Sequence, residues 1–556
     1  MIFQLFLNIA AGLGCFALLG SLPVRAMPFV NSNSAERWVY STLLGLPVIA
    51  AVITLALSLH IPNLALIAVL WGLVILALGF VVRDTLRDHR WGKSRAEHRV
   101  VSLLFVSLLL NTFLQVAFVA YPDVRGLNGQ RQMQRGDGLP SDCIVPELVA
   151  DFIVHRRDPE KTAFMGDWRL SDRTPLMGMS FAGAELMLGL RPYPAFVGFG
   201  TLMNAFFLLP AFLILRRSRP DHRAYRVFFA LCTCLVFITL NLWFTWPKLL
   251  ASAYILLAWD WMQSRRSPWI GGALLALGWL SHPVVFFAYP GFLLMTALHA
   301  RRGRRILTAL QTALGLALTM IPWRIYCAFW NPDHSRLVRW HLFGEMPATE
   351  EPLRIAARRY FAQHGFAWIL QTRGNNLFFS LELRLWFTAL AAVTRHQPEG
   401  MKGLRDFAFF YLFGALDPLL AAAMVFGLWK IARQQWARPR ELLGVFVLAM
   451  ATWFVGSCFF GMPGNAVNHQ YAYAAIVMFL LFGAWVAGEL PQKWGVLLVG
   501  LVILYELFVN VGHLLLHERA PVLSTELVVY VVLLIAGLSL AGSERLWQDH
   551  AETASP

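Results

Sequence analysis

Long apolar runs recur along the whole chain, and they constrain its fold more than any other feature. A helix needs about 20 apolar residues to cross the hydrocarbon core of a bilayer. By this measure we expect about 15 spans, or roughly 13–15 if neighbouring short runs are merged. They lie near residues 3–23, 40–59, 63–82, 101–120, 194–215, 226–244, 247–263, 268–282, 284–300, 306–327, 416–432, 442–460, 470–488, 494–513 and 523–541. Lipid offers the backbone no hydrogen-bond partners, so the sequence predicts an all-α polytopic membrane protein.

The composition excludes a soluble enzyme. Of the 556 residues 58% are apolar and 14% are charged, against about 25% charged in an ordinary soluble domain. The net charge of +15 would otherwise suggest nucleic acid as a partner. Because Arg and Lys gather in short loops between apolar runs, we read the charge as the positive-inside pattern. Membrane lipids are therefore the expected surroundings, and no nucleic acid is expected.

The basic clusters predict which loops share a side of the membrane. They occupy 83–99, 216–226, 265–266, 301–305 and 430–440, and this side should be cytoplasmic. Two long polar segments, 121–193 and 331–415, fall on the other side as outer loops with short amphipathic helices. Compact loops and short tails favour a bacterial inner membrane, with the working face toward the periplasm.

The predicted spans and outer loops divide the chain into four parts. Residues 1–100 are additional N-terminal spans with a cytoplasmic loop, and 101–330 form a transmembrane core that includes the first outer loop. The second outer loop follows at 331–415, and 416–556 are C-terminal transmembrane helices.

The first outer loop carries a short helix preceded by a carboxylate. Apolar residues recur at helical spacing between Pro146 and Ile153, with Glu147 and Asp151 on the other side. The pattern predicts an amphipathic helix over 146–153 at the membrane surface. Asp142 lies just before it and either caps the helix or acts as a general base toward a hydroxyl. Carboxylates here could also hold a divalent cation, but no cofactor is required.

Farther along the same loop, Gly166-Asp167-Trp168 is followed by Thr174-Pro175-Leu176. This order resembles GT-C-class glycosyltransferases, a superfamily that includes lipid A aminoarabinose transferases and protein mannosyltransferases. Their first large outer loop opens with an acidic residue or pair, then an amphipathic helix, a GDW motif and a PPL-type motif. The resemblance implies that Asp142 is the catalytic carboxylate and that Asp172 and Arg173 match the polar pair before the second motif.

The chain departs from that pattern in three ways. Cys143 stands where the family commonly has Glu, and Thr174 stands where it has the first Pro. The loop follows the fourth predicted span, whereas the family places it after the first. Asp123, directly after that span, is the runner-up carboxylate, and it could equally be a polar helix cap.

The resemblance further implies an inverting transferase with a polyprenyl-phosphate sugar donor and a lipid, glycan or protein acceptor. Such an enzyme needs cations for the donor phosphate. Lys248 lies in a short outer turn, where it either snorkels to headgroups or binds phosphate. His282 in a second such turn is a structural residue or a phosphate ligand. In the second outer loop Arg336, Arg339 and His341 form a candidate phosphate site or a surface that contacts headgroups.

Two other functions remain open. A glycan polymerase or ligase with a diphosphate-linked donor would share the many spans and an Arg-bearing outer loop. A lipid or solute transporter should show broken helices and charges near the membrane midplane. The sequence has no P-loop and no dinucleotide fingerprint, so ATP-driven transport is not expected.

Overall fold

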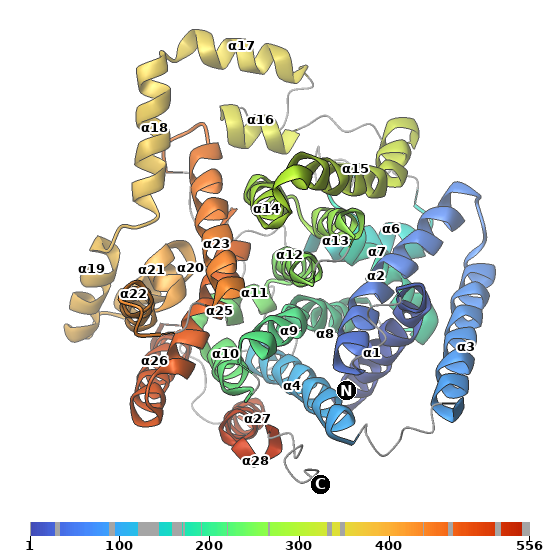
Figure 1. Ribbon diagram of the computed structural model, residues 1–556, viewed down its shortest axis with the longest axis horizontal. Coiled ribbons are helices and arrows are strands. Elements are labelled where there is room, and N and C mark those ends of the chain that lie inside the picture. The colour runs from blue at the N-terminus through green and yellow to red at the C-terminus, as the bar shows by residue number, and fades with distance from the viewer. Residues whose placement is uncertain are drawn as a thin grey trace.

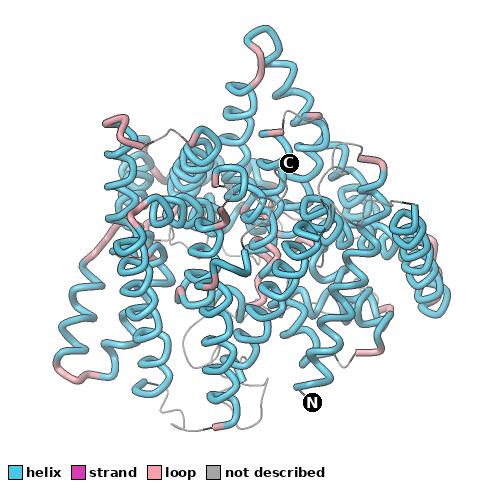
Figure 2. Tube along the Cα trace, turned by 60° about the horizontal axis from the view of Figure 1, so that its bottom comes forward, coloured by secondary structure: helices cyan, strands magenta, loops and turns pink. Residues whose placement is uncertain are grey.

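The computed structural model describes residues 2–27, 34–87, 95–120, 144–157, 170, 173–190, 192–219, 221–264, 267–330, 336–344, 351–436, 439–464, 471–517 and 524–547. This described part is helical and contains no strand (Figure 2). Its helices form a bundle in which α12 and α14 are seen close to end-on in Figure 1.

The helices follow the apolar runs. The first half contains α1 (Ile2–Arg25), α2 (Ser34–Ser58), α3 (Asn63–Arg87), α4 (Arg95–Ala120), α6 (Val145–Val154), α7 (Leu176–Leu188), α8 (Pro192–Ala205), α9 (Leu208–Ser218), α10 (Arg223–Cys234), α11 (Val236–Trp243), α12 (Lys248–Gln263), α13 (Pro268–Ser281), α14 (Val285–His299), η4 (Arg302–Arg304) and α15 (Arg305–Trp330). The second half contains α16 (Arg336–Phe343), α17 (Leu353–Gln363), α18 (Phe366–Phe379), α19 (Arg384–Thr394), α20 (Pro398–Phe410), α21 (Leu412–Leu416), α22 (Pro418–Ala432), α23 (Arg440–Phe459), α25 (Tyr473–Glu489), α26 (Gln492–Gly512), η5 (His513–His517), α27 (Thr525–Gly542) and α28 (Glu544–Trp547).

Length and hydropathy identify the protein as a multi-pass membrane protein. Within the described residues 9 candidate spans are long and apolar enough to cross a membrane, or up to 10 if the bent pair α10–α11 is one span. Shorter apolar helices of 10–17 residues include α13, α14, α22 and α25. These coincide with predicted spans, so the expected total of about 15 depends on counting them.

One candidate span was not expected. Phe366–Thr394, which comprises α18 and α19, passes the same test although the sequence places it in the second outer loop. Figure 1 shows α17 and α18 from the side, so they run across the direction of the central helices. Only 11% of the most apolar window of this segment is buried, so α18 and α19 contribute little to the core.

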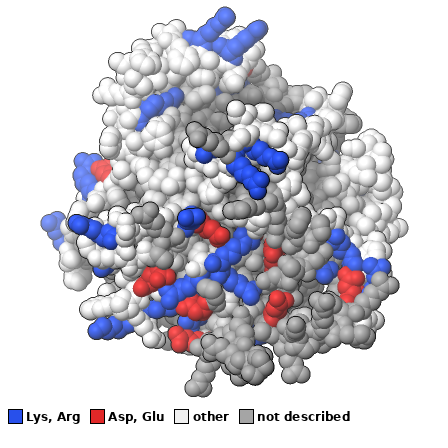
Figure 3. Space-filling model, in the orientation of Figure 1, with Lys and Arg blue, Asp and Glu red and all other residues white. Residues whose placement is uncertain are grey.

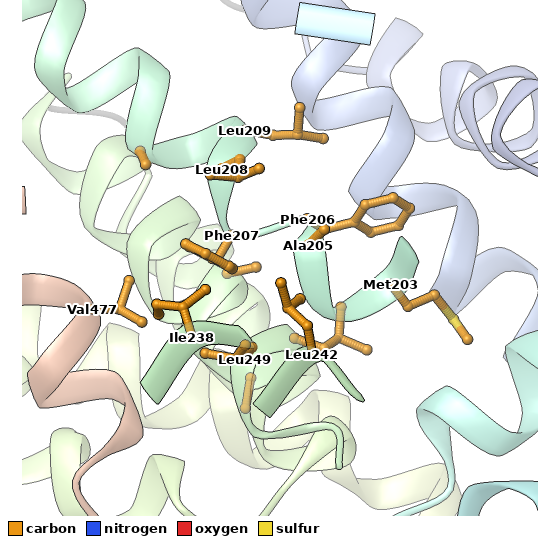
Figure 4. Close-up of a cluster of buried hydrophobic side chains, with 14 of the residues drawn as sticks. Met203, Ala205, Phe206, Phe207, Leu208, Leu209, Ile238, Leu242, Leu249 and Val477 are labelled. Atoms are coloured by element: carbon orange, nitrogen blue, oxygen red, sulfur yellow. The ribbon is translucent and has the colours of Figure 1, made fainter. Parts of the chain in front are cut away.

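A buried apolar core joins the central helices. Figure 4 shows a cluster of buried side chains that includes Phe207, just after α8, Ile238 and Leu242 of α11, Leu249 of α12 and Val477 of α25. All five are at most 1% exposed. Helix α12 is buried over most of its length, which makes it the axis around which the functional residues are arranged.

Charged residues gather at one end of the bundle. Arg217 at the end of α9 binds buried Asp260 of α12 at 3.0 Å. Arg219 binds Glu489 at the end of α25 at 2.8 Å. Tyr40 donates to Asp260 at 2.8 Å, and Arg37, one turn earlier in α2, binds Asp84 of α3 at 3.3 Å. Figure 3 shows basic and acidic side chains interspersed over this face, which we call the charged end.

Helices α1 and α2 approach each other closely through glycine. A Cβ on Gly45 would lie 2.0 Å from the backbone oxygen of Phe16, and one on Gly20 would lie 1.8 Å from that of Ser41. Small residues of this kind let the backbones of membrane helices pack directly against each other. The contact fixes α2, which carries Tyr40, against the rest of the bundle.

We expect Gly45→Ala to destabilise the protein by about 1–3 kcal/mol, because the added methyl group forces the two backbones apart. The thermal unfolding midpoint in detergent measures this. Gly72→Ala is the matched control, since a Cβ on Gly72 in α3 meets nothing within 4 Å. An equal midpoint for the two variants would contradict the prediction.

Candidate functional site

Lys248 begins α12 at the end opposite the charged end. It lies twelve positions before Asp260, which corresponds to about 18 Å along the helix axis. The side chain is 4% exposed. Its Nζ lies 3.8 Å from the ring centroid of Trp246 and 4.4 Å from that of Tyr473 at the start of α25. Burying an ammonium group is costly, and two aromatic faces offset part of that cost.

Lys248 belongs to a group of four basic side chains from separate segments. Burial, Lys248, Arg173 and His341 together lower the pKa of His282 well below its usual value. Burial, Lys248 and Arg173 lower the pKa of His341 to about 4. The structure thus brings together Arg173, Lys248, His282 and His341, which we call the basic cluster. With their pKa values lowered in this way, both imidazoles are neutral at pH 7.

The loop before α7 is anchored beside the turn that carries His282. The Thr174 hydroxyl donates to the backbone oxygen of Ser281, the last residue of α13, at 2.6 Å. This bond places neighbouring Arg173 near the α13–α14 turn. The backbone N–H of Val284 donates to Nδ1 of His282 at 3.1 Å. A neutral His282 therefore carries its proton on Nε2, which makes that atom a hydrogen-bond donor.

His341 reaches the basic cluster from α16. Its ring stacks on Trp340 at 4.8 Å and meets Phe460 edge-on at 5.1 Å. Residues two positions apart on a helix point in widely different directions, and Arg339 indeed donates to the backbone oxygen of Glu351 at 2.7 Å. Arg339 thus holds the backbone two residues before α17. Arg336, one turn earlier, is also buried. Of the predicted Arg-Arg-His group, His341 belongs to the basic cluster.

The predicted carboxylates Asp123, Asp142 and Asp172 lie outside the described residues. Their described neighbours are informative. The helix expected over 146–153 is present as α6, and it packs on α7, where a Cβ on Gly178 would lie 2.6 Å from Val149. The N-cap of α6 is Ile144, which makes no side-chain capping hydrogen bond.

A second polar group was not predicted. Helices α10 and α11 are bent by 64° at Leu235, inside a segment expected to be one span. The side chain of Glu506 in α26 accepts from the backbone N–H of Val236 at 2.7 Å, and Asn510 donates to the backbone oxygen of Cys234 at 2.9 Å. The Glu506 carboxyl group also interacts with that of Asp417, which caps α22. In the sequence, the feature that could have indicated this group is Glu506, a lone Glu in the apolar run 494–513.

Loss of the Lys248 charge should change the titration of His341. We expect Lys248→Met to raise the pKa of His341 from about 4 toward its usual value, because one of two repelling cations is removed. In the wild type, His341 of the unfolded chain binds a proton between about pH 6.5 and 4, whereas His341 of the folded protein stays neutral there. The free energy of unfolding should therefore fall as the pH drops through that window. NMR of ¹⁵N-labelled histidines measures the pKa, and an unchanged value would contradict the prediction.

The described residues contain no group of three or more His, Cys, Asp or Glu side chains that could hold a metal ion. The basic cluster instead suits an anion, because it combines two cations with an N–H donor. The chain matches no protein-family model, no curated protein and no solved structure.

Proposed function

We propose that the protein is an integral membrane glycosyltransferase that transfers a sugar from a polyprenyl-phosphate donor to a hydroxyl acceptor. The observation that carries the proposal is the basic cluster. It joins Arg173, next to the Gly-Asp-Trp and Thr-Pro-Leu motifs, to Lys248 and two neutral imidazoles. A lipid-linked donor requires its phosphate to be bound near the membrane surface, and the cluster lies at the ends of helices, opposite the charged end.

In this proposal each residue has a specific role in the reaction. Asp142 takes the proton of the acceptor hydroxyl, whose oxygen attacks the anomeric carbon of the sugar with inversion. The bond from that carbon to the phosphate oxygen breaks, and polyprenyl phosphate leaves with the electron pair. Lys248 and Arg173 stabilise the charge that develops on the phosphate, and Nε2–H of His282 donates to it. Asp172, beside Arg173 in the chain, is the alternative base.

The positive-inside pattern supports an orientation for this reaction. Arg217 and Arg219 at the charged end lie in 216–226, one of the Arg-rich segments predicted to be cytoplasmic. The Lys248 end then faces the opposite side, which in a bacterial inner membrane is the periplasm. Donor and acceptor would meet there, and both would approach from the outer leaflet or the outer solution.

The test is transfer of labelled sugar by the purified protein in nanodiscs. The donors should include polyprenyl monophosphate sugars and the same sugars on polyprenyl diphosphate. Membrane extracts supply the acceptors. Transfer from a monophosphate donor supports the proposal. Transfer from the diphosphate donors alone would replace it with a glycan polymerase or ligase.

A transporter is the second candidate, and the break between α10 and α11 favours it. Interrupted helices with buried carboxylates are how secondary transporters hold coupling ions. If this reading is correct, vesicles should show protein-dependent movement of labelled lipid or solute. That movement should be lost in Glu506→Gln, while no sugar is transferred by the wild type.

A further inference from the structure

Helices α17 and α18 supply the polar contacts of a segment that leads to the basic cluster. This segment, Phe459–Gly464, begins at the last residue of α23. Tyr360 of α17 donates to the backbone oxygen of Gly461 at 2.8 Å, and Arg373 of α18 donates to that of Phe459 at 2.8 Å.

Asn376 of α18 makes the largest number of these contacts. Its amide nitrogen donates to the backbone oxygens of Phe460 at 3.0 Å and Met462 at 3.1 Å. Its amide oxygen accepts from the backbone N–H of Gly464 at 3.0 Å. The side chain is 0% exposed. Asn376 and Thr372 are the buried residues of α18, and Asn376 thus makes three hydrogen bonds to one short segment.

The same segment holds His341. The backbone N–H of Gly461 donates to the backbone oxygen of His341 at 2.9 Å, and the Phe460 ring packs edge-on against the imidazole. The fit is tight, because a Cβ on Gly461 would lie 1.9 Å from the backbone oxygen of Leu342. A shift of the segment therefore moves both the ring that covers His341 and the backbone that carries it.

We propose that Asn376 is a positioning residue for the basic cluster, acting through Phe459–Gly464 to hold His341 in place. This role rests on the proposed function, because only there is the basic cluster the site that binds the donor phosphate. Its geometry is independent of any reaction. An outer helix that adds little to the apolar core thereby sets the environment of an imidazole in the bundle.

The test is the rate at which diethyl pyrocarbonate modifies His341, followed by mass spectrometry of peptides. Asn376→Ala leaves two backbone oxygens and one N–H without these partners, so the segment loosens. We expect His341 to react about fivefold faster or more. Asn375→Ala, which changes the exposed neighbouring Asn, is the matched control and should match the wild type.

Two further readouts separate a local effect from unfolding. His282 has its own bond to Val284 and should keep its wild-type reactivity in Asn376→Ala. Asn376→Asp keeps the size and the acceptor for Gly464 but loses both donors, so its His341 rate should be raised as well. An unchanged His341 rate in both variants overturns the inference, and so does an equal increase at His282. These modification rates are measured without any sugar donor, so they can fail or succeed independently of the transfer assay that tests the proposed function.

Discussion

Replacing Lys248 by Met should lower the rate of sugar transfer by about 100-fold or more. Removing one donor that stabilises developing negative charge typically costs this much. The effect is expected to be large because Lys248 is buried, and water cannot take over its role. We also expect weaker donor binding, since the same ammonium group attracts the phosphate before the reaction. Initial rates at varied donor concentration measure both effects.

Lys430→Met is the matched control for this experiment. Lys430 also lies near two aromatic rings, with its Nζ 5.3 Å from Phe426 and 5.2 Å from Trp429, and it donates to Gln435 at 2.6 Å. It is half-buried near the C-terminus of α22 and its hydrogen bond to Gln435 is exposed, so its charge can be lost at little cost. Equal transfer by Lys248→Met and Lys430→Met would remove Lys248 from the site.

Asp142→Asn should lower transfer by about 10²–10⁴-fold while leaving donor binding intact. A general base contributes about this much to the rate, and the amide has the same shape but cannot take the proton. The contrast with Lys248→Met lies in the binding step, because Asp142 acts on the acceptor. Binding of a labelled polyprenyl-phosphate sugar to each purified variant measures that difference.

Asp137→Asn is the control for the base, because Asp137 lies in the same loop between two glycines. It should transfer sugar at the wild-type rate. If Asp142→Asn also retains full transfer, the base must be sought at Asp172 or Asp123. A loss of donor binding in Asp142→Asn would instead place this carboxylate on the donor side of the reaction.

The sequence predicts individual helices well and their breaks poorly. The runs at 268–282 and 284–300 appear as α13 and α14 with nearly the expected limits, because hydropathy and the Ser281-His282-Pro283 turn both point there. The run at 226–244 was expected to be one span. It breaks at Leu235 without Pro or Gly, because Glu506 and Asn510 satisfy the backbone groups that the break frees. Those partners are too distant in sequence for a local pattern to show.

The sequence indicates several individual residues of the site, but it does not show which of them lie close together. Lys248 stands out because basic residues are rare on its side of the membrane, and Arg173 stands out through the neighbouring motifs. Nothing in their spacing shows that both act on His282 and His341, or that Arg339 of the same short helix binds the backbone of Glu351 instead. Tertiary packing alone decides which side of α16 meets the cluster.

The capping of the α10–α11 break has a consequence for how the protein is made. Val236 and Glu506 are 270 residues apart, and no earlier part of the chain carries this carboxylate. At about 5–20 residues per second, roughly 15–50 seconds pass between their synthesis. During that time the backbone N–H of Val236 lacks the Glu506 carboxylate that it binds in the finished fold. The α10–α11 break can therefore reach its final hydrogen bonding only after α26 has been made.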